Sequence, residues 1–147
     1  MEIKPLEVTQ NDIDKFLSVH GGLMRAYYMS YIGTANVFSK VDAWRGIYLS
    51  LRVQIERKSA DSINPALTEA ERAEWRKQAQ ESILNLCYVT IFHINTIDKA
   101  TLTDICRILS MMRFQHPIGE ALVEADLVFK DKVVSAIVAI GNRIKEL

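Results

Sequence analysis

The sequence has 147 residues, of which 49% are hydrophobic and 24% are charged, a composition that is typical of a globular protein and argues against disorder. Eighteen Lys and Arg residues balance eighteen Asp and Glu residues, so the positive excess common in nucleic-acid-binding domains is missing. The first ten residues contain no basic segment followed by an apolar run. We therefore expect no secretory signal and a cytoplasmic location.

Residues 1–8 are expected to form an extended N-terminal arm. Thr9, with Asp12 three residues later, has the spacing of a capping box and opens a short helix. His20-Gly21-Gly22 is expected to end this helix, because glycine accepts the left-handed backbone conformation. A second helix is predicted for residues 23–38. Gly33 lies inside it and weakens it by about 1 kcal/mol relative to alanine.

Ser39 and Asp42 predict the start of a third helix. Apolar residues then follow at spacings of 3, 4, 3 and 4, which is a helical seam: Val41, Trp44, Tyr48, Leu51 and Ile55. Small and polar residues together with Pro65 predict the main loop of the chain at residues 59–67.

Thr68 and Glu71 form a capping-box pattern that starts the longest predicted helix, at about residues 69–97. Its second half, residues 82–97, has no charged side chain, and its apolar residues point in every direction around the helix. Such a helix must be covered, and this stretch is too short and too polar to span a bilayer. We therefore expect a central helix wrapped by the other helices, and no membrane span.

Thr101 and Asp104 predict the cap of a shorter helix, and Pro117 suits the first turn of a last helix. That last helix carries apolar residues at spacings of 4, 3, 4 and 3, a heptad pattern that suggests contact with a second subunit: Val133, Ile137, Ile140, Ile144 and Leu147. The predicted fold class is all-α. It is a compact bundle of five or six helices around the central apolar helix, forming a single helical domain over residues 1–147.

Potential metal ligands do not fall into a known spacing such as CxxC, HxxxH or HExxH. They are His20, His93, His116, Cys87 and Cys106. The two cysteines lie in apolar helical patterns, where reduced thiols behave as small hydrophobic groups. We therefore predict no metal ligand, no cofactor-binding residue and no disulfide.

His93 is the one titratable residue in the apolar half of the central helix. It shares an arc with Asn85, Thr90 and Thr96, which predicts either a small buried pocket or a satisfied core histidine, the second being the commoner case. The sequence lacks the common nucleotide-binding and hydrolase motifs. No catalytic residue is predicted, and an enzyme is less favoured than a binding protein.

One alternative function is a helix–turn–helix DNA-binding regulator at about residues 102–128. Its first helix would reach Leu109, the connection would span residues 110–117, and the recognition helix would begin at Ile118. Acidic residues on that last helix and the length of the connection oppose this reading. The candidate DNA-binding residues are Arg107, Arg113 and Lys130.

Partner binding is the favoured function, because aromatic and arginine side chains are the usual anchors of protein interfaces. The chain is predicted to be a non-catalytic adaptor or inhibitor that binds another protein and forms a homodimer. Tyr27 and Tyr28 point about 100° apart, so one of them could equally belong to the core. The partner-binding candidates are Arg25, Tyr27, Tyr28, Trp75, Ile140 and Ile144.

Overall fold

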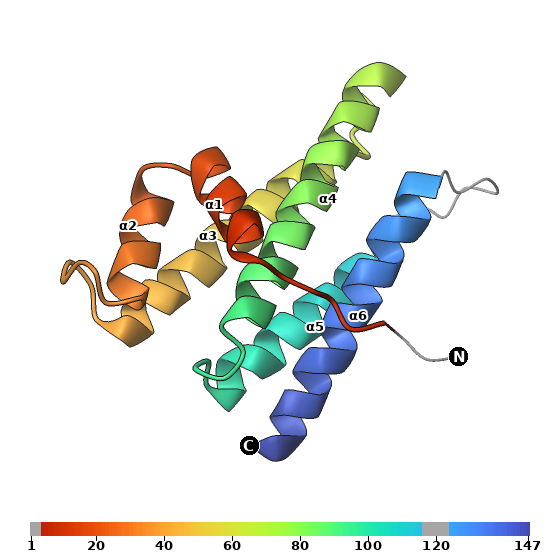
Figure 1. Ribbon diagram of the computed structural model, residues 1–147. Coiled ribbons are helices and arrows are strands. Elements are labelled where there is room, and N and C mark those ends of the chain that lie inside the picture. The colour runs from red at the N-terminus through yellow and green to blue at the C-terminus, as the bar shows by residue number, and fades with distance from the viewer. Residues whose placement is uncertain (1–3, 116–123) are drawn as a thin grey trace. The chain divides into compact units, whose positions relative to one another are not determined.

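The computed structural model describes residues 4–115 and 124–147, which form six helices and no strand (Figure 1). The predicted all-α class is confirmed. Within the described residues, no helix has the length and hydropathy needed to cross a membrane. The helices are α1 (Gln10–Val19), α2 (Leu23–Tyr31), α3 (Lys40–Asp61), α4 (Glu69–Phe92), α5 (Lys99–Gln115) and α6 (Glu124–Glu146).

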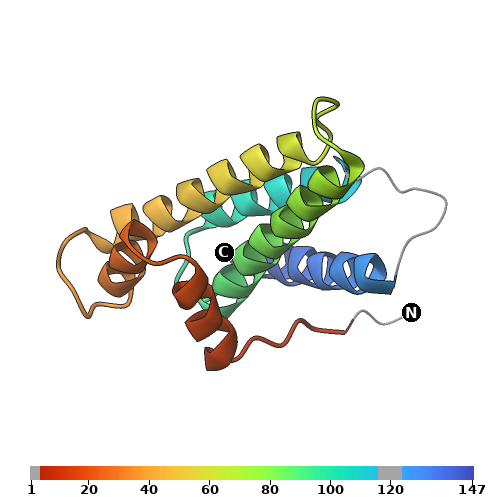
Figure 2. The ribbon, with the colours of Figure 1, turned by 90° about the horizontal axis from the view of Figure 1, so that it is seen from above.

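The chain divides into two compact units. The first is Gln10–Leu86, which holds α1, α2, α3 and most of α4; the second combines the N-terminal arm with Cys87–Leu147. In the first unit α2 packs along α3, and in the second α5 packs along α6 (Figures 1 and 2). The single domain predicted for residues 1–147 stays a prediction.

Helix α2 ends at Tyr31, so the predicted helix to residue 38 is wrong. Gly33 has a φ of 85°, and it follows the helix instead of lying inside it. Its N–H donates to Ser30 O at 3.2 Å, and the N–H of Thr34 donates to Met29 O at 2.9 Å. This pair of bonds is the Schellman motif, which satisfies the last carbonyl groups of a helix and requires a residue with positive φ.

Helix α3 begins as predicted, because Ser39 Oγ accepts a hydrogen bond from the N–H of Asp42 at 3.2 Å. The helix continues to Asp61, so the connection to α4 begins at Ser62 instead of residue 59. Four members of the predicted seam are buried, whereas Val41 is 75% exposed.

Helix α4 begins with the predicted capping box. Thr68 Oγ1 accepts from the N–H of Glu71, and Glu71 Oε1 accepts from the N–H of Thr68, both at 3.1 Å. Hydrogen bonds to the Glu71 carboxyl, first from the backbone N–H of Thr68 and second from its side chain, hold the pKa of this group below its usual value. Of residues 82–97, which are predicted to be covered on every side, none of 82–91 is exposed, but Phe92, Asn95 and Thr96 are exposed, so the prediction is wrong at its C-terminal end.

The same helix ends at Phe92, five residues before the predicted end. Residues 93–96 form a turn in which both the N–H and the hydroxyl of Thr96 donate to His93 O. Asp98 then caps α5, because its carboxylate accepts from Thr101 N at 3.1 Å and from Thr101 Oγ1 at 2.7 Å. The predicted cap at Thr101 is therefore wrong. The bonds from Thr101 lower the pKa of Asp98.

Helix α5 runs without interruption to Gln115. Ser110 belongs to this helix, and its hydroxyl donates to Cys106 O at 2.8 Å. The connection predicted for the helix–turn–helix alternative is therefore wrong over residues 110–115. The predicted start of the recognition helix at Ile118 lies outside the described residues.

Helix α6 and the N-terminal arm contact each other within the second unit. Ser135 Oγ donates a hydrogen bond to Lys4 O at 2.6 Å, and Lys132 Nζ donates to the hydroxyl of Tyr88 at 3.1 Å. Apolar residues spaced three or four apart on α6 are buried: Phe129, Val133, Ala136 and Ile140. The opposite face of α6 is therefore left to solvent.

Candidate functional site

Two of the predicted partner-binding residues are core residues of the described chain. Tyr28 is 3% exposed and Ile140 is 0% exposed, so both pack inside the chain instead of presenting a surface. Ile144 and Trp75 are half-buried, and Arg25 is exposed on α2. The candidates on α2 and α4 belong to the first unit, whereas Ile140 and Ile144 belong to the second.

Tyr27 packs within the first unit. Its ring lies 4.6 Å from the ring of Phe38, and it covers Gly46 so closely that a Cβ atom at position 46 would lie 2.5 Å from the ring. Tyr27 therefore joins α2 to α3. Gly46 in the sequence indicates this contact, since a glycine inside a helix often marks a close approach of another element.

Two of the predicted DNA-binding residues, Arg107 and Lys130, lie on different helices. Arg107 is exposed on α5, where its guanidinium lies 3.8 Å from the carboxylate of Asp104. Lys130 is exposed on α6. The side chain of Arg113 lies outside the described part of the structure.

The described residues include potential metal ligands and two cysteine thiols. No group of three His, Cys, Asp or Glu side chains in that part of the chain is close enough to hold a metal ion. Cys87 and Cys106 are both free thiols. Complete burial raises the pKa of the Cys87 thiol to about 12, so this thiol stays protonated and is a poor nucleophile.

His93 lies in the turn after α4, where its ring contacts the ring of Phe92 at 5.0 Å. The residues of the predicted polar arc do not all belong to one site around His93, because Asn85 forms a hydrogen bond with a different histidine. Asn85 Nδ2 donates to His20 Nε2 at 3.0 Å. The polar site of the first unit is thus centred on His20, which the sequence marked only as one of several potential metal ligands.

A hollow of about 460 Å³ opens beside His20. One wall is a stripe of α3 formed by Ser50, Gln54 and Lys58, which are four residues apart and so share a helix face. The rest of the lining comes from the end of α1, the connection to α2 and the first turn of α2, which includes Leu23 and Met24. We call this feature the His20 hollow.

The electrostatics of the His20 hollow favour negative charge. Burial, and second the charge of Lys58, lower the pKa of His20 below 6.5, so the imidazole is neutral at pH 7. Lys58 Nζ donates to Ser82 Oγ at 3.0 Å, which uses one of its three N–H bonds. Among the described residues, no carboxylate lines the hollow and none forms an ion pair with Lys58.

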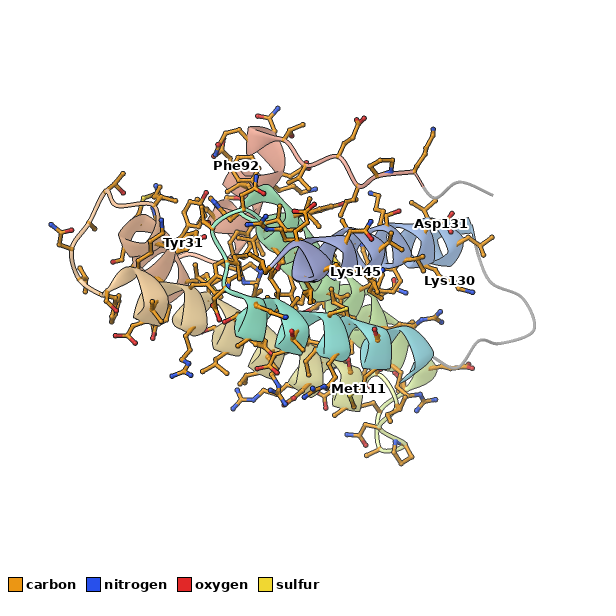
Figure 3. The ribbon with its side chains drawn as sticks, turned by 90° about the horizontal axis from the view of Figure 1, so that it is seen from below. Tyr31, Phe92, Met111, Lys130, Asp131 and Lys145 are labelled. Carbon is orange, nitrogen blue, oxygen red and sulfur yellow. The ribbon has the colours of Figure 1, made fainter. Side chains whose placement is uncertain are left out.

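A second candidate site is the solvent-facing side of α6. Leu127 and Val138 are 45% and 40% exposed, and Asp131 and Lys145 are exposed with them. Positions 131, 138 and 145 are seven residues apart, almost two helical turns, so they form one stripe. We call Leu127, Asp131, Val138 and Lys145 the α6 outer face, of which Figure 3 labels Asp131 and Lys145.

No protein-family model, curated protein or solved structure matches this chain.

Proposed function

We propose that this chain is a non-catalytic protein-binding module whose partner is a second copy of itself, held through the α6 outer face. The observation that carries the proposal is the charge pattern of that face. Asp131 and Lys145 lie seven residues on either side of Val138, toward opposite ends of α6 (Figure 3). Neither charge forms an ion pair with another described residue.

A twofold axis at Val138 makes this pattern self-complementary. If two copies of α6 pack antiparallel, Asp131 lies opposite Lys145 of the partner subunit, and Lys145 lies opposite Asp131 of the partner subunit. Val138 meets its own equivalent at the centre. An interface of this isologous type is the commonest arrangement in homodimers.

The energies expected for this contact indicate a reversible dimer. Each exposed ion pair contributes about 0.2–1 kcal/mol, and burial of apolar surface adds about 25 cal/mol per Å² before the cost of association. The dimer should therefore dissociate on dilution and on addition of salt, because salt screens exposed charges.

Helix α3 also exposes apolar side chains, with Leu49 at 47% and Val53 at 45%. Its charges are arranged differently, because Arg52 Nε already bonds to Glu56 Oε1 at 3.1 Å within the same helix. The α6 outer face is therefore the better supported interface. We place the dimer in the cytoplasm, where a free thiol such as Cys87 stays reduced.

The proposal predicts that Val138→Glu abolishes the dimer, because two unpaired carboxylates would meet at the axis. Sedimentation velocity over a range of protein concentrations measures the effect. Val53→Glu is the matched control, since Val53 has similar exposure on α3, and it should leave the dimer intact. A wild-type chain that sediments as a monomer at every concentration would refute the proposed function.

A further inference from the structure

We propose that the His20 hollow binds a small organic carboxylate that carries a short apolar group. The hollow lies wholly in the first unit, so this site is independent of the α6 outer face. Its volume of about 460 Å³ falls within the range of about 300–1,000 Å³ that small-molecule sites occupy.

The charge of the hollow sets the charge of the ligand. Lys58 is the one cation among the described residues that line the hollow, and none of these residues is acidic. A single unneutralised ammonium group matches a single negative charge. This favours a carboxylate over a phosphate group, which carries nearly two charges at neutral pH.

Hydrogen-bond donors are available for the carboxylate oxygens. Lys58 keeps two N–H bonds after its bond to Ser82. Because His20 Nε2 accepts from Asn85, the neutral ring carries its proton on Nδ1, and among the described residues none accepts a hydrogen bond from this atom. The amide of Gln54 and the hydroxyl of Ser50 supply further donors along the same stripe of α3.

The apolar part of the ligand is predicted from the apolar residues that line the hollow outside α3. Val19 is 64% exposed and Leu23 is 59% exposed, and both line the hollow together with Met24. A ligand that covers these side chains would bury apolar surface that the free chain leaves in water. The ligand therefore has one charged end and one apolar end.

The start of α2 adds to the preference for an anion. Gly22 is its N-cap residue and makes no side-chain capping bond, and the first turn contains no acidic residue. The positive end of the α2 dipole is thus uncompensated at the wall that Leu23 and Met24 form.

Phenylacetate is a suitable probe, with phenylacetamide as its uncharged counterpart. Titration of the full-length chain with millimolar phenylacetate, followed by two-dimensional amide NMR, should give saturable shifts at Gly21, Leu23 and Gln54. Phenylacetamide should bind about tenfold more weakly or not at all, because a hydrogen bond to a charged group contributes about 1.5–3 kcal/mol. Inorganic phosphate should not compete.

Two variants test the site itself. Lys58→Gln should weaken phenylacetate binding about tenfold, whereas Lys77→Gln, which removes an exposed lysine from α4, should not. Leu23→Asp keeps α2 intact, because an acidic residue suits a helix N-terminus, and it should abolish binding by repulsion. The proposal is overturned if wild-type shifts do not saturate, if phenylacetamide or phosphate binds equally well, or if both Lys58→Gln and Leu23→Asp bind normally.

Discussion

His20 is surrounded by groups that disfavour its protonated form. It is buried, it lies near the charge of Lys58, and its Nε2 atom accepts a hydrogen bond from the amide of Asn85. Protonation of Nε2 would replace this bond by a contact between two donors. The folded chain therefore keeps the imidazole neutral under conditions in which an unfolded histidine takes up a proton.

The stability of the chain should fall on mild acidification. The pKa of His20 is below 6.5 in the folded state and near 6.5 in the unfolded state, so between these values the unfolded state binds more protons. The contribution of His20 to the free energy of unfolding is therefore fully present above pH 6.5, and it is lost as the pH falls through the folded-state pKa of His20. Urea unfolding followed by circular dichroism, from about pH 7.5 to about pH 5, measures this loss.

His20→Gln provides the control, because glutamine cannot titrate. The variant should show a flatter dependence of unfolding free energy on pH in the same window. Glu71 and Asp98 also have lowered pKa values, but they lose their contributions only at more acidic pH. An unchanged slope in His20→Gln would assign the pH dependence to another group.

At the scale of helices, α2 depends on its contact with α3. It has nine residues, fewer than an isolated helix needs to be stable in water. Its aromatic residues supply the contact: Tyr27 covers Gly46, and the ring of Tyr31 lies 5.1 Å from the ring of Trp44. These contacts hold α2 in place between its two glycine-containing ends.

Gly46→Ala should destabilise the chain, although alanine is favoured over glycine in a helix by about 1 kcal/mol. The new Cβ would meet the Tyr27 ring at 2.5 Å, and overpacking of this kind costs about 1–3 kcal/mol. In a Tyr27→Ala background the clash is absent, so the same replacement should stabilise. Urea unfolding of the four variants measures the coupling, and equal effects of Gly46→Ala in both backgrounds would contradict the contact.

Local patterns in the sequence predicted the helices well where the deciding residues are neighbours. The caps at Ser39 and Thr68 depend on side chains three residues apart, and both form as predicted. The end of α2 and the start of α5 differ from the prediction because each segment has an acceptable alternative. Gly33 is tolerated inside a helix but is better used after one, and Asp98 competes with Thr101 as a cap.

For the molecule as a whole, the all-α class followed from helical periodicity, but the candidate sites did not. Asn85 and His20 are 65 positions apart, and no spacing rule links them. The apolar pattern of α6 correctly indicated a helix with a buried side, yet it could not show that Ile140 belongs to that side. The solvent-facing stripe became recognisable only once burial was known.

Exchange of two charges tests whether two copies of α6 pair Asp131 with Lys145. Asp131→Lys or Lys145→Asp alone should weaken the dimer about tenfold, because two attractions become repulsions. The double variant restores opposite charges across the axis and should recover the wild-type dissociation constant. Sedimentation equilibrium at low salt measures the dissociation constant of all four chains. A double variant that dissociates as readily as the single variants would rule out the pairing of Asp131 with Lys145.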